Sequence, residues 1–268
     1  MEFGACFLEF SQVRSYPQLE LIKHHELQIM PVYQLDDSLW FPDPNYAWND
    51  GILAIGGDLS VNRLILAYRM GIFPWFNEGE PILWWSPNPR YVIFPDKLKI
   101  SKSMRRVLRD NTFKVTYDTE FKAVITACRD IRRNGQFGTW ITESMLEAYC
   151  VLHEAGFAHS VEVWQEGELV GGLYGVSLGK FFFGESMFTK VSNASKTGFI
   201  QLVKQLQARD FELIDCQQGT RHLISLGAEP ISRKNFIQRL TTIGVSNTLN
   251  GSWKEWNLKD EHEENREL

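Results

Sequence analysis

The second half of the chain carries the pattern that most constrains the fold. Three apolar stretches of strand length follow one another there: Ser160–Trp164, Leu169–Val176 and Lys180–Phe188. Two short turn sequences, Glu166-Gly167 and Leu178-Gly179, separate them. Connections this short join strands that run antiparallel to each other. We therefore expect the chain to build an antiparallel meander.

A helix and a further strand follow the meander. Asn193 begins a helical pattern that runs to about Ala208, and Glu212 to Gln217 is an apolar strand. The remaining elements expected in this half are a strand over Phe113–Tyr117 and helices over Phe121–Arg132, Thr142–Ala155 and Arg233–Leu240. The pattern as a whole predicts a mixed α+β protein.

The order of three antiparallel strands, a helix and one more strand resembles the core of the N-acetyltransferase-like (GNAT) fold. The resemblance implies an acyl donor that binds between two strands that splay apart. Members that use acetyl-CoA carry a glycine-bearing loop at the helix start for the pyrophosphate. Residues 191–196 occupy that place here and contain no glycine. We therefore expect an acyl donor other than CoA.

The N-terminal part predicts a small lobe. A turn-rich stretch at 41–50 leads to Gly56–Ser60 and to a helical pattern from Arg63 to Met70, which Gly71 ends. Residues 71–90 are dense in Trp and Pro, which excludes a long helix or a central strand and favours a loop or an edge segment. The expected divisions are an N-terminal extension without assigned function at 1–38, a small N-terminal domain at 39–92, a GNAT-like catalytic domain at 93–243 and an acidic tail at 244–268.

Net charge taken alone argues against a nucleic-acid ligand. The 268 residues hold 28 basic and 33 acidic side chains, which gives a formal net charge of −5. Between Lys97 and Arg133, however, 11 basic residues stand against four acidic ones, so this window carries +7 and the remainder carries −12. The overall value therefore averages a basic region against an acidic remainder.

Within the basic window, Ser101 is placed to cap a helix, and four cations follow at the spacing of one helical face. They are Lys102, Arg105, Arg106 and Arg109. Such a face is either solvated or binds phosphates, because like charges repel one another unless an anion neutralises them. Phosphate contacts of this kind hold a nucleic acid without reading its sequence.

Several other protein classes are excluded. The sequence shows no signal peptide and no apolar run of membrane-spanning length, and its four cysteines are scattered, so a cytoplasmic protein is expected. Residues 175–179 match the G-x-S-x-G motif of serine hydrolases, but they lie at a turn between strands instead of between a strand and a helix. His153 and His159 are six residues apart, which does not fit a helical zinc motif.

Polar residues interrupt two of the apolar strands. Asp215 and Gln217 lie on one face of their strand, with Ile214 and Cys216 on the other, and Glu185 lies in the last strand of the meander. A buried carboxylate must be hydrogen-bonded, because its desolvation is otherwise costly. Any one such residue is more often structural than functional, but two neighbouring strands that both carry one favour a site.

Seven blocks of the sequence together resemble the leucyl/phenylalanyl-tRNA–protein transferase family. In chain order they are Gly-Gly-Asp-Leu-Ser at 56–60, Gly-Ile-Phe-Pro-Trp-Phe at 71–76, Trp-Trp-Ser-Pro-x-Pro-Arg at 84–90, Gly-Thr-Trp-Ile-Thr at 138–142, Gly-Glu-Ser-Met-Phe at 184–188, Asn-Ala-Ser-Lys-Thr at 193–197 and Leu-Ile-Asp-Cys-Gln at 213–217. The resemblance runs from about Trp40 to Leu240.

The resemblance implies an enzyme that transfers Leu or Phe, and Met more weakly, from the 3′ end of aminoacyl-tRNA. The acceptor is the α-amine of a protein that begins with Arg or Lys, and the product carries a degradation signal of the bacterial N-end rule pathway. The resemblance also implies a cytoplasmic enzyme without cofactor, metal or ATP, since the aminoacyl ester is already activated. We expect a monomer that contacts no membrane.

By the same resemblance, Gln217 contacts the attacking amine, Asp215 orients or polarises Gln217, and Glu185 completes the catalytic set. Whether Asp215 takes a proton itself stays open. The pocket for the aminoacyl-adenosine is expected to consist of Tyr68, Trp75, Trp140, Leu173, Phe182, Met187 and Ile214. The last four fit an ordinary core equally well. The cationic helix face at 102–109 would bind the tRNA, and Glu185 together with the overall acidity would recognise a cationic acceptor.

Two alternatives belong to other functional classes. One is a GNAT-type N-acetyltransferase, which the absence of a pyrophosphate loop disfavours. The other is a tRNA-binding module without catalysis, which the presence of Glu185, Asp215 and Gln217 disfavours.

Overall fold

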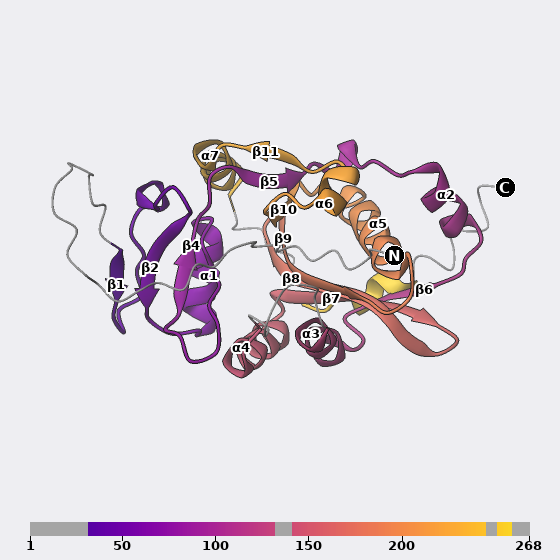
Figure 1. Ribbon diagram of the computed structural model, residues 1–268, viewed down its shortest axis with the longest axis horizontal. Coiled ribbons are helices and arrows are strands. Elements are labelled where there is room, and N and C mark those ends of the chain that lie inside the picture. Colours follow the sequence, from indigo (N-terminus) through magenta and orange to yellow (C-terminus); the bar gives the residue numbers. More distant parts are fainter. Residues whose placement is uncertain (1–31, 132–140, 245–250, 259–268) are drawn as a thin grey trace.

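The computed structural model describes residues 32–131, 141–244 and 251–258, which form two β-sheets with helices around them (Figure 1). The prediction of a mixed α+β protein is confirmed. None of the helices in these ranges is both long and apolar enough to span a membrane.

The N-terminal lobe contains a four-stranded sheet of order β1-β2-β4-β3. Its strands are β1 (Tyr33–Leu35), β2 (Ile52–Gly56), β3 (Phe73–Pro74) and β4 (Leu83–Trp85), and its helices are η1 (Pro44–Tyr46) and α1 (Val61–Arg69). Helix α1 begins at Ser60, whose hydroxyl accepts a hydrogen bond from the Arg63 N–H.

The Trp- and Pro-rich stretch of this lobe corrects one expectation. It contains β4, which pairs with both β2 and β3 and is therefore an interior strand. The prolines do not prevent this, because Pro81 and Pro87 flank β4 and Pro74 lies in β3 at the edge of the sheet. The aromatic side chains are buried: Trp84 has no exposed surface and Trp85 is 8% exposed.

The larger sheet has seven strands in the order β11-β5-β10-β9-β8-β7-β6. The strands are β5 (Arg90–Ile93), β6 (Lys114–Tyr117), β7 (Ala158–Gln165), β8 (Glu168–Leu178), β9 (Phe181–Thr189), β10 (Leu213–Gln217) and β11 (Glu229–Ile231). The predicted meander is confirmed as β7-β8-β9, with antiparallel pairing throughout. Glu166 and Gly167 take φ values of 53° and 83°, as the tight turn between β7 and β8 requires.

Strand β10 lies parallel to β9, and the long helix α5 makes the crossover between them. On its other side β10 pairs with β5, which follows directly from the N-terminal lobe. The domain boundary expected between residues 92 and 93 falls inside β5.

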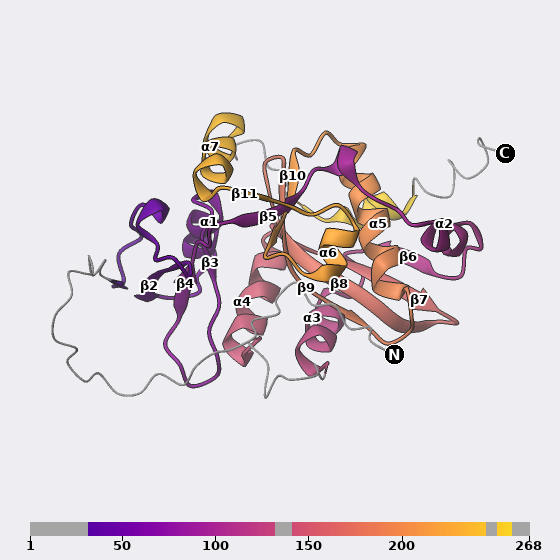
Figure 2. The ribbon, with the colours of Figure 1, turned by 45° about the horizontal axis from the view of Figure 1, so that its top comes forward.

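Helices cover both faces of the larger sheet (Figures 1 and 2). The remaining helices are η2 (Pro95–Lys97), α2 (Lys102–Arg109), α3 (Phe121–Asp130), α4 (Glu143–Glu154), α5 (Ala194–Gln207), α6 (Arg221–Ser225), α7 (Arg233–Ile243) and η3 (Trp253–Leu258). Helices α3 and α4 share one hydrophobic cluster with α1 and the small sheet. Helix α5 and η3 pack into a second cluster on the opposite face. The site described next lies on the side of the first cluster.

Candidate active site

Glu185 is presented by a bulge in β9. Tyr174 of β8 pairs with Ser186 and Gly175 pairs with Gly184, so Glu185 is an extra residue without a direct partner in the ladder. A bulge turns a side chain away from the regular alternation of the strand. It directs this carboxylate to the face that α1 and α4 cover, where the side chain is only 1% exposed.

Three hydrogen bonds hold the buried carboxylate. The Tyr68 hydroxyl of α1 donates to Oε1 at 2.7 Å, the Tyr149 hydroxyl of α4 donates to Oε2 at 3.2 Å, and the Gln217 amide Nε2 donates to Oε1 at 3.1 Å. The two tyrosine hydroxyls are also hydrogen-bonded to each other. Burial raises the pKa of Glu185 to about 7, although the Tyr68 hydrogen bond acts in the opposite direction.

Asp215 forms a fully buried ion pair with Arg90. The arginine Nε and Nη2 atoms donate to the two carboxylate oxygens at 2.8 and 2.6 Å, a bidentate arrangement that fixes both groups. The guanidinium lies between the rings of Phe73 and Phe236, with its Cζ 4.7 and 4.8 Å from their centroids. Neither oxygen of Asp215 is left without a partner.

Gln217 follows a second bulge, this one in β10. The register against β5 shifts between Asp215 and Gln217, and Gln217 takes a φ of 59°, in the left-handed region. Its backbone N–H donates to Asp215 Oδ1 at 2.8 Å, which holds this unusual conformation. Because Nε2 is bonded to Glu185, the amide oxygen Oε1 points elsewhere; it is buried and has no hydrogen-bond partner among the described residues.

The bulges lie where β9 and β10 part. The backbone ladder between the two strands consists of Leu213 with Phe181, Ile214 with Phe182, and Asp215 with Phe183. Beyond that point, a side-chain hydrogen bond from Gln217 to Glu185 connects the strands. A buried polar cluster with an unpartnered acceptor therefore occupies the place where two parallel strands diverge.

Family models and relatives agree on what the chain resembles. The model described as leucyl/phenylalanyl-tRNA protein transferase matches residues 92–241, and the model of the N-terminal domain of the same enzyme matches residues 57–88. The chain is 57% identical over 224 residues to the leucyl/phenylalanyl-tRNA–protein transferase of Desulfatibacillum aliphaticivorans, which covers 84% of this chain and 96% of that one. The chain belongs to the leucyl/phenylalanyl-tRNA–protein transferase family.

A second relative of that name, from Flavobacterium johnsoniae, is 58% identical over 209 residues, which cover 78% of this chain and 99% of the relative. Solved structures are far more distant. L-PGS from Bacillus licheniformis gives a TM-score of 0.35 at 13% identity and covers 57% of this chain and 50% of its own. A GCN5-related N-acetyltransferase from Kribbella flavida gives 0.32 at 10% identity, with coverage of 63% and 60%.

The residues that the family resemblance singled out lie in several parts of the structure. Glu185, Asp215, Gln217 and Tyr68 come together on one face of the sheet, as described above. Trp75 follows β3 directly and is 8% exposed; its ring meets Trp85 edge-on at 5.4 Å and its carbonyl accepts the Trp85 indole N–H.

The four apolar pocket candidates lie on the other face. Leu173, Phe182, Met187 and Ile214 are buried in the second hydrophobic cluster, packed with residues of α5. They lie on β8, β9 and β10. Trp140 lies outside the described residues.

The cations expected to bind tRNA are on the surface. Lys102, Arg105, Arg106 and Arg109 are all exposed on α2, whereas Met104 is buried in the second hydrophobic cluster. Helix α2 lies at the end of the large sheet farthest from the small sheet (Figure 1). The phosphate-binding and catalytic assignments therefore concern two separate regions of the molecule.

Two members of the cluster were not identified as candidates from the sequence, Arg90 and Tyr149. Arg90 is the last residue of the Trp-Trp-Ser-Pro-x-Pro-Arg block and the first residue of a buried strand. A buried arginine needs an anionic partner, and this requirement is the sequence signal that points to Arg90. Tyr149 lies in the apolar pattern of α4 and gave no such signal.

Proposed function

We propose that this protein transfers Leu or Phe, and Met more weakly, from aminoacyl-tRNA to the α-amine of proteins that begin with Arg or Lys. Family membership supports aminoacyl transfer with tRNA and protein substrates. The observation that carries the proposal is the unpartnered, buried Gln217 Oε1, held in a fixed direction at the divergence of β9 and β10. An acceptor atom kept this way fits an incoming N–H donor.

The acceptor amine supplies that donor. An α-amine titrates near pH 8, so a substantial fraction is neutral at physiological pH and nucleophilic without a strong base. An N–H that donates to Gln217 Oε1 directs the nitrogen lone pair toward the ester carbonyl. Positioning of this kind can supply on the order of 7–11 kcal/mol of the barrier.

Asp215 acts through Gln217 in this proposal. Its Oδ1 accepts from Arg90 Nε and from the Gln217 backbone N–H, and its Oδ2 accepts from Arg90 Nη2. A carboxylate bonded at both oxygens holds its partners in fixed positions. We therefore assign Asp215 to orienting Gln217, with Arg90 as its counter-ion.

Glu185 fixes the other end of the amide. The hydrogen bond from Gln217 Nε2 to Glu185 Oε1 decides which amide atom faces the substrate. Tyr68 and Tyr149 fix the carboxylate in turn. Glu185 is thus the link between the amide and both flanking helices, and its charge would favour an acceptor that carries a cationic side chain.

The reaction exchanges one acyl bond for another. The amine nitrogen forms a bond to the ester carbonyl carbon, and the bond from that carbon to the 3′ oxygen of the terminal adenosine breaks. The amine gives up one proton and the departing oxygen gains one, so the exchange needs no oxidant or reductant. The product is a peptide bond and a tRNA with its terminal hydroxyl restored.

The remaining assignments follow the divergence of the strands. The aminoacyl side chain would enter between β9 and β10 toward Leu173, Phe182, Met187 and Ile214, while Tyr68, Trp75 and Trp140 serve the adenosine side. The exposed cations of α2 would contact tRNA phosphates. We further propose that the enzyme is a cytoplasmic monomer that marks its acceptors for N-end rule degradation.

The test uses Phe-tRNA with labelled Phe and two acceptors that differ only in whether their first residue is Arg or Asp. We expect label in the Arg protein alone, and none with either acceptor when Gln217→Ala replaces the wild type. Intact ester after incubation with the Arg protein would refute transfer. Binding of tRNA without transfer would indicate a binding module, and binding of acetyl-CoA would indicate an acetyltransferase.

A further inference from the structure

The C-terminal segment Gly251–Leu258 lies beyond the stretch that the family models match, yet it packs into the catalytic domain. Trp253 is 2% exposed and Trp256 is 8% exposed, and both belong to the same hydrophobic cluster as α5. A surface segment that buries two tryptophans has a defined place in the fold.

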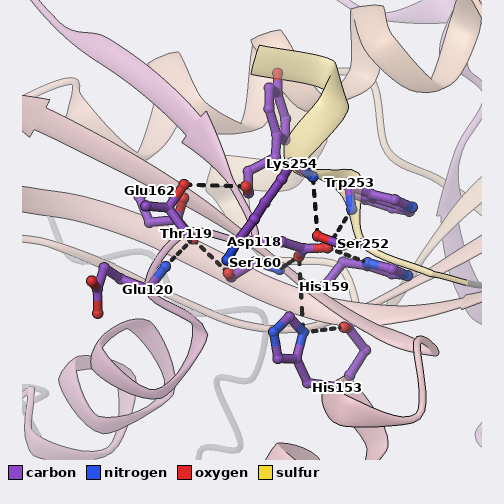
Figure 3. Close-up of polar contacts among 12 residues, drawn as sticks. Asp118, Thr119, Glu120, His153, His159, Ser160, Glu162, Ser252, Trp253 and Lys254 are labelled. Atoms are coloured by element: carbon purple, nitrogen blue, oxygen red, sulfur yellow. Dashed lines mark hydrogen bonds and ion pairs between the residues drawn. The ribbon is translucent and has the colours of Figure 1, made fainter. Parts of the chain in front are cut away.

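Asp118 anchors this segment (Figure 3). Its carboxylate accepts from the Trp253 backbone N–H at 2.6 Å, from the Ser160 N–H at 2.9 Å and from His159 Nδ1 at 2.9 Å. The loop after β6, strand β7 and the C-terminal segment are therefore tied to one buried group. Because this carboxylate is itself held by several hydrogen bonds, it fixes the Trp253 backbone in space.

The aromatic rings of the segment and of His159 form a stack. Trp253 lies parallel to His159, with centroids 3.7 Å apart, and Trp256 lies on Trp253 at 4.0 Å. The Arg209 guanidinium closes the stack, 4.0 Å from the Trp256 ring. Because Trp253 has a ring on each of its faces, it has little freedom to shift.

The stack reaches the candidate pocket through Phe182. The Trp253 and Phe182 ring centroids are 5.8 Å apart. The Phe182 ring also lies over Gly175, since a Cβ at that position would be 2.5 Å from Phe182 Cζ. Gly175 in turn pairs with Gly184, the residue before Glu185. Phe182 is therefore confined between Trp253 and the strand beside the catalytic bulge.

We propose that Trp253 is a specificity-determining residue that sets the depth of the aminoacyl pocket by holding Phe182 in place. The proposal rests on the aminoacyl transfer and the pocket assigned above. A wall residue with a fixed ring behind it cannot recede, so the pocket keeps one volume. Without that ring, Phe182 gains room and the pocket deepens, which leaves a small side chain in poorer contact than a large one.

The experiment compares kcat/KM for Phe-tRNA and Leu-tRNA in the full-length protein and in Trp253→Phe and Trp253→Leu variants, with one Arg-initiated acceptor. We expect the Leu-to-Phe ratio of kcat/KM to fall by about tenfold in Trp253→Leu, because pocket contacts of one or two methylenes discriminate by that much. The ratio for Trp253→Phe should lie between the ratios of Trp253→Leu and the wild type. A purely structural role of Trp253 would lower kcat/KM for both substrates by the same factor.

Trp256→Phe is the matched control, since it lies in the same stack but has no ring contact with Phe182 among the aromatic pairs described. We expect it to lower the melting temperature and to leave the ratio unchanged. An unchanged ratio in folded Trp253 variants, or an equal change in Trp256→Phe, would overturn the proposal. A wild-type protein that transfers neither residue would instead refute the transferase activity itself.

Discussion

Glu185 is a carboxylic acid enclosed by two phenols and an amide, without access to water. Burial brings its pKa to about 7, so near neutral pH the group exists in both protonation states. Each state still accepts hydrogen bonds, but only the carboxylate attracts the Gln217 amide N–H by charge. The orientation of Gln217 therefore depends on pH through Glu185.

The same shift makes a prediction about stability. Between its ordinary value near 4.5 and about 7, Glu185 keeps a proton in the folded protein that the unfolded chain has released. This contribution to folding is present below pH 4.5 and is lost as the pH rises to about 7. Glu185→Gln has no such loss, so its stability relative to wild type should rise by about 3 kcal/mol between pH 4 and pH 8. Urea unfolding at both pH values measures this, and parallel pH profiles would contradict it.

Arg90 gives a second prediction at this scale. Arg90→Lys keeps the positive charge beside Asp215 but loses the bidentate hydrogen bond to it. Asp215, and through it Gln217, should then be held less firmly. We expect kcat to fall by about tenfold or more, as misplaced catalytic groups commonly cause, with tRNA affinity unchanged. Steady-state kinetics and tRNA titration measure the two effects.

Arg63→Lys is the control for this change. Arg63 is equally buried and pairs with Asp58 at 3.0 Å, but it lies in the small lobe and has no bond to Asp215 or Gln217. It should lose stability and retain kcat. Equal loss of kcat in both variants would show that Arg90 acts through general stability.

At the scale of elements, bulges in β9 and β10 bring the polar residues together. A regular β9 would keep Glu185 in the alternation of its neighbours, and a regular β10 would leave Gln217 in extended conformation. The two irregularities lie side by side where pairing between the strands ends. The site is thus a local departure from an otherwise regular sheet.

Helix α2 makes a prediction at this scale. Arg105 and Arg106 are exposed, and the ion pair of Arg106 with Asp110 is 3.6 Å long and open to solvent, so both are available to phosphates. Arg105→Gln with Arg106→Gln should weaken tRNA binding and reduce the slope of log Kd against log salt by about 1 to 2. Fluorescence titrations at several salt concentrations measure the slope. Lys234→Gln on α7 is the control. An unchanged slope in the α2 variant would show that this helix face does not contact tRNA phosphates.

The elements differ in how far the sequence could predict them. The meander, α5 and β10 follow from clear periodicity and short turns. The short strands β1, β2, β5 and β11 have three to five residues each and gain their stability from partners distant in the chain. The prolines around β4 argue against a central strand in the sequence, although they lie just outside the strand in the structure.

The candidate site shows the same division. Glu185, Asp215 and Gln217 were identifiable because they are polar residues in apolar strands. The pairing of these residues with Arg90 and Tyr149 was not, because Arg90 is 125 residues from Asp215 and Tyr149 is 36 residues from Glu185. The bulges were equally hidden, since they depend on the register between strands.

At the scale of the whole molecule, the small lobe completes the site of the large sheet. It supplies Tyr68 from α1, while α4 and β9 supply Tyr149 and Glu185. Arg233 of α7 ties that lobe in place: Nη1 donates to the carbonyls of Pro44 and Ala47 at 2.8 and 3.1 Å. The position of the lobe and the geometry of the site are therefore coupled.

This coupling is testable through Arg233→Met. The variant removes the hydrogen bonds from the guanidinium to the Pro44 and Ala47 carbonyls, so we expect a loss of stability of about 3 kcal/mol and faster hydrogen exchange in residues 32–62. Transfer should fall while tRNA affinity at α2 is retained. Lys234→Met, the exposed neighbour, is the control. Loss of tRNA affinity equal to the loss of transfer would mean that α2 depends on the lobe as well.

Gln217 also limits how this protein can be improved. A side chain in the left-handed region costs about 1 kcal/mol or more relative to glycine, and the folded chain carries that cost at all times. Selection for heat resistance alone would favour glycine at this position, and glycine would delete the amide. Substitutions that raise the thermal stability should therefore occur elsewhere in the chain, while Gln217 is retained despite its conformational cost.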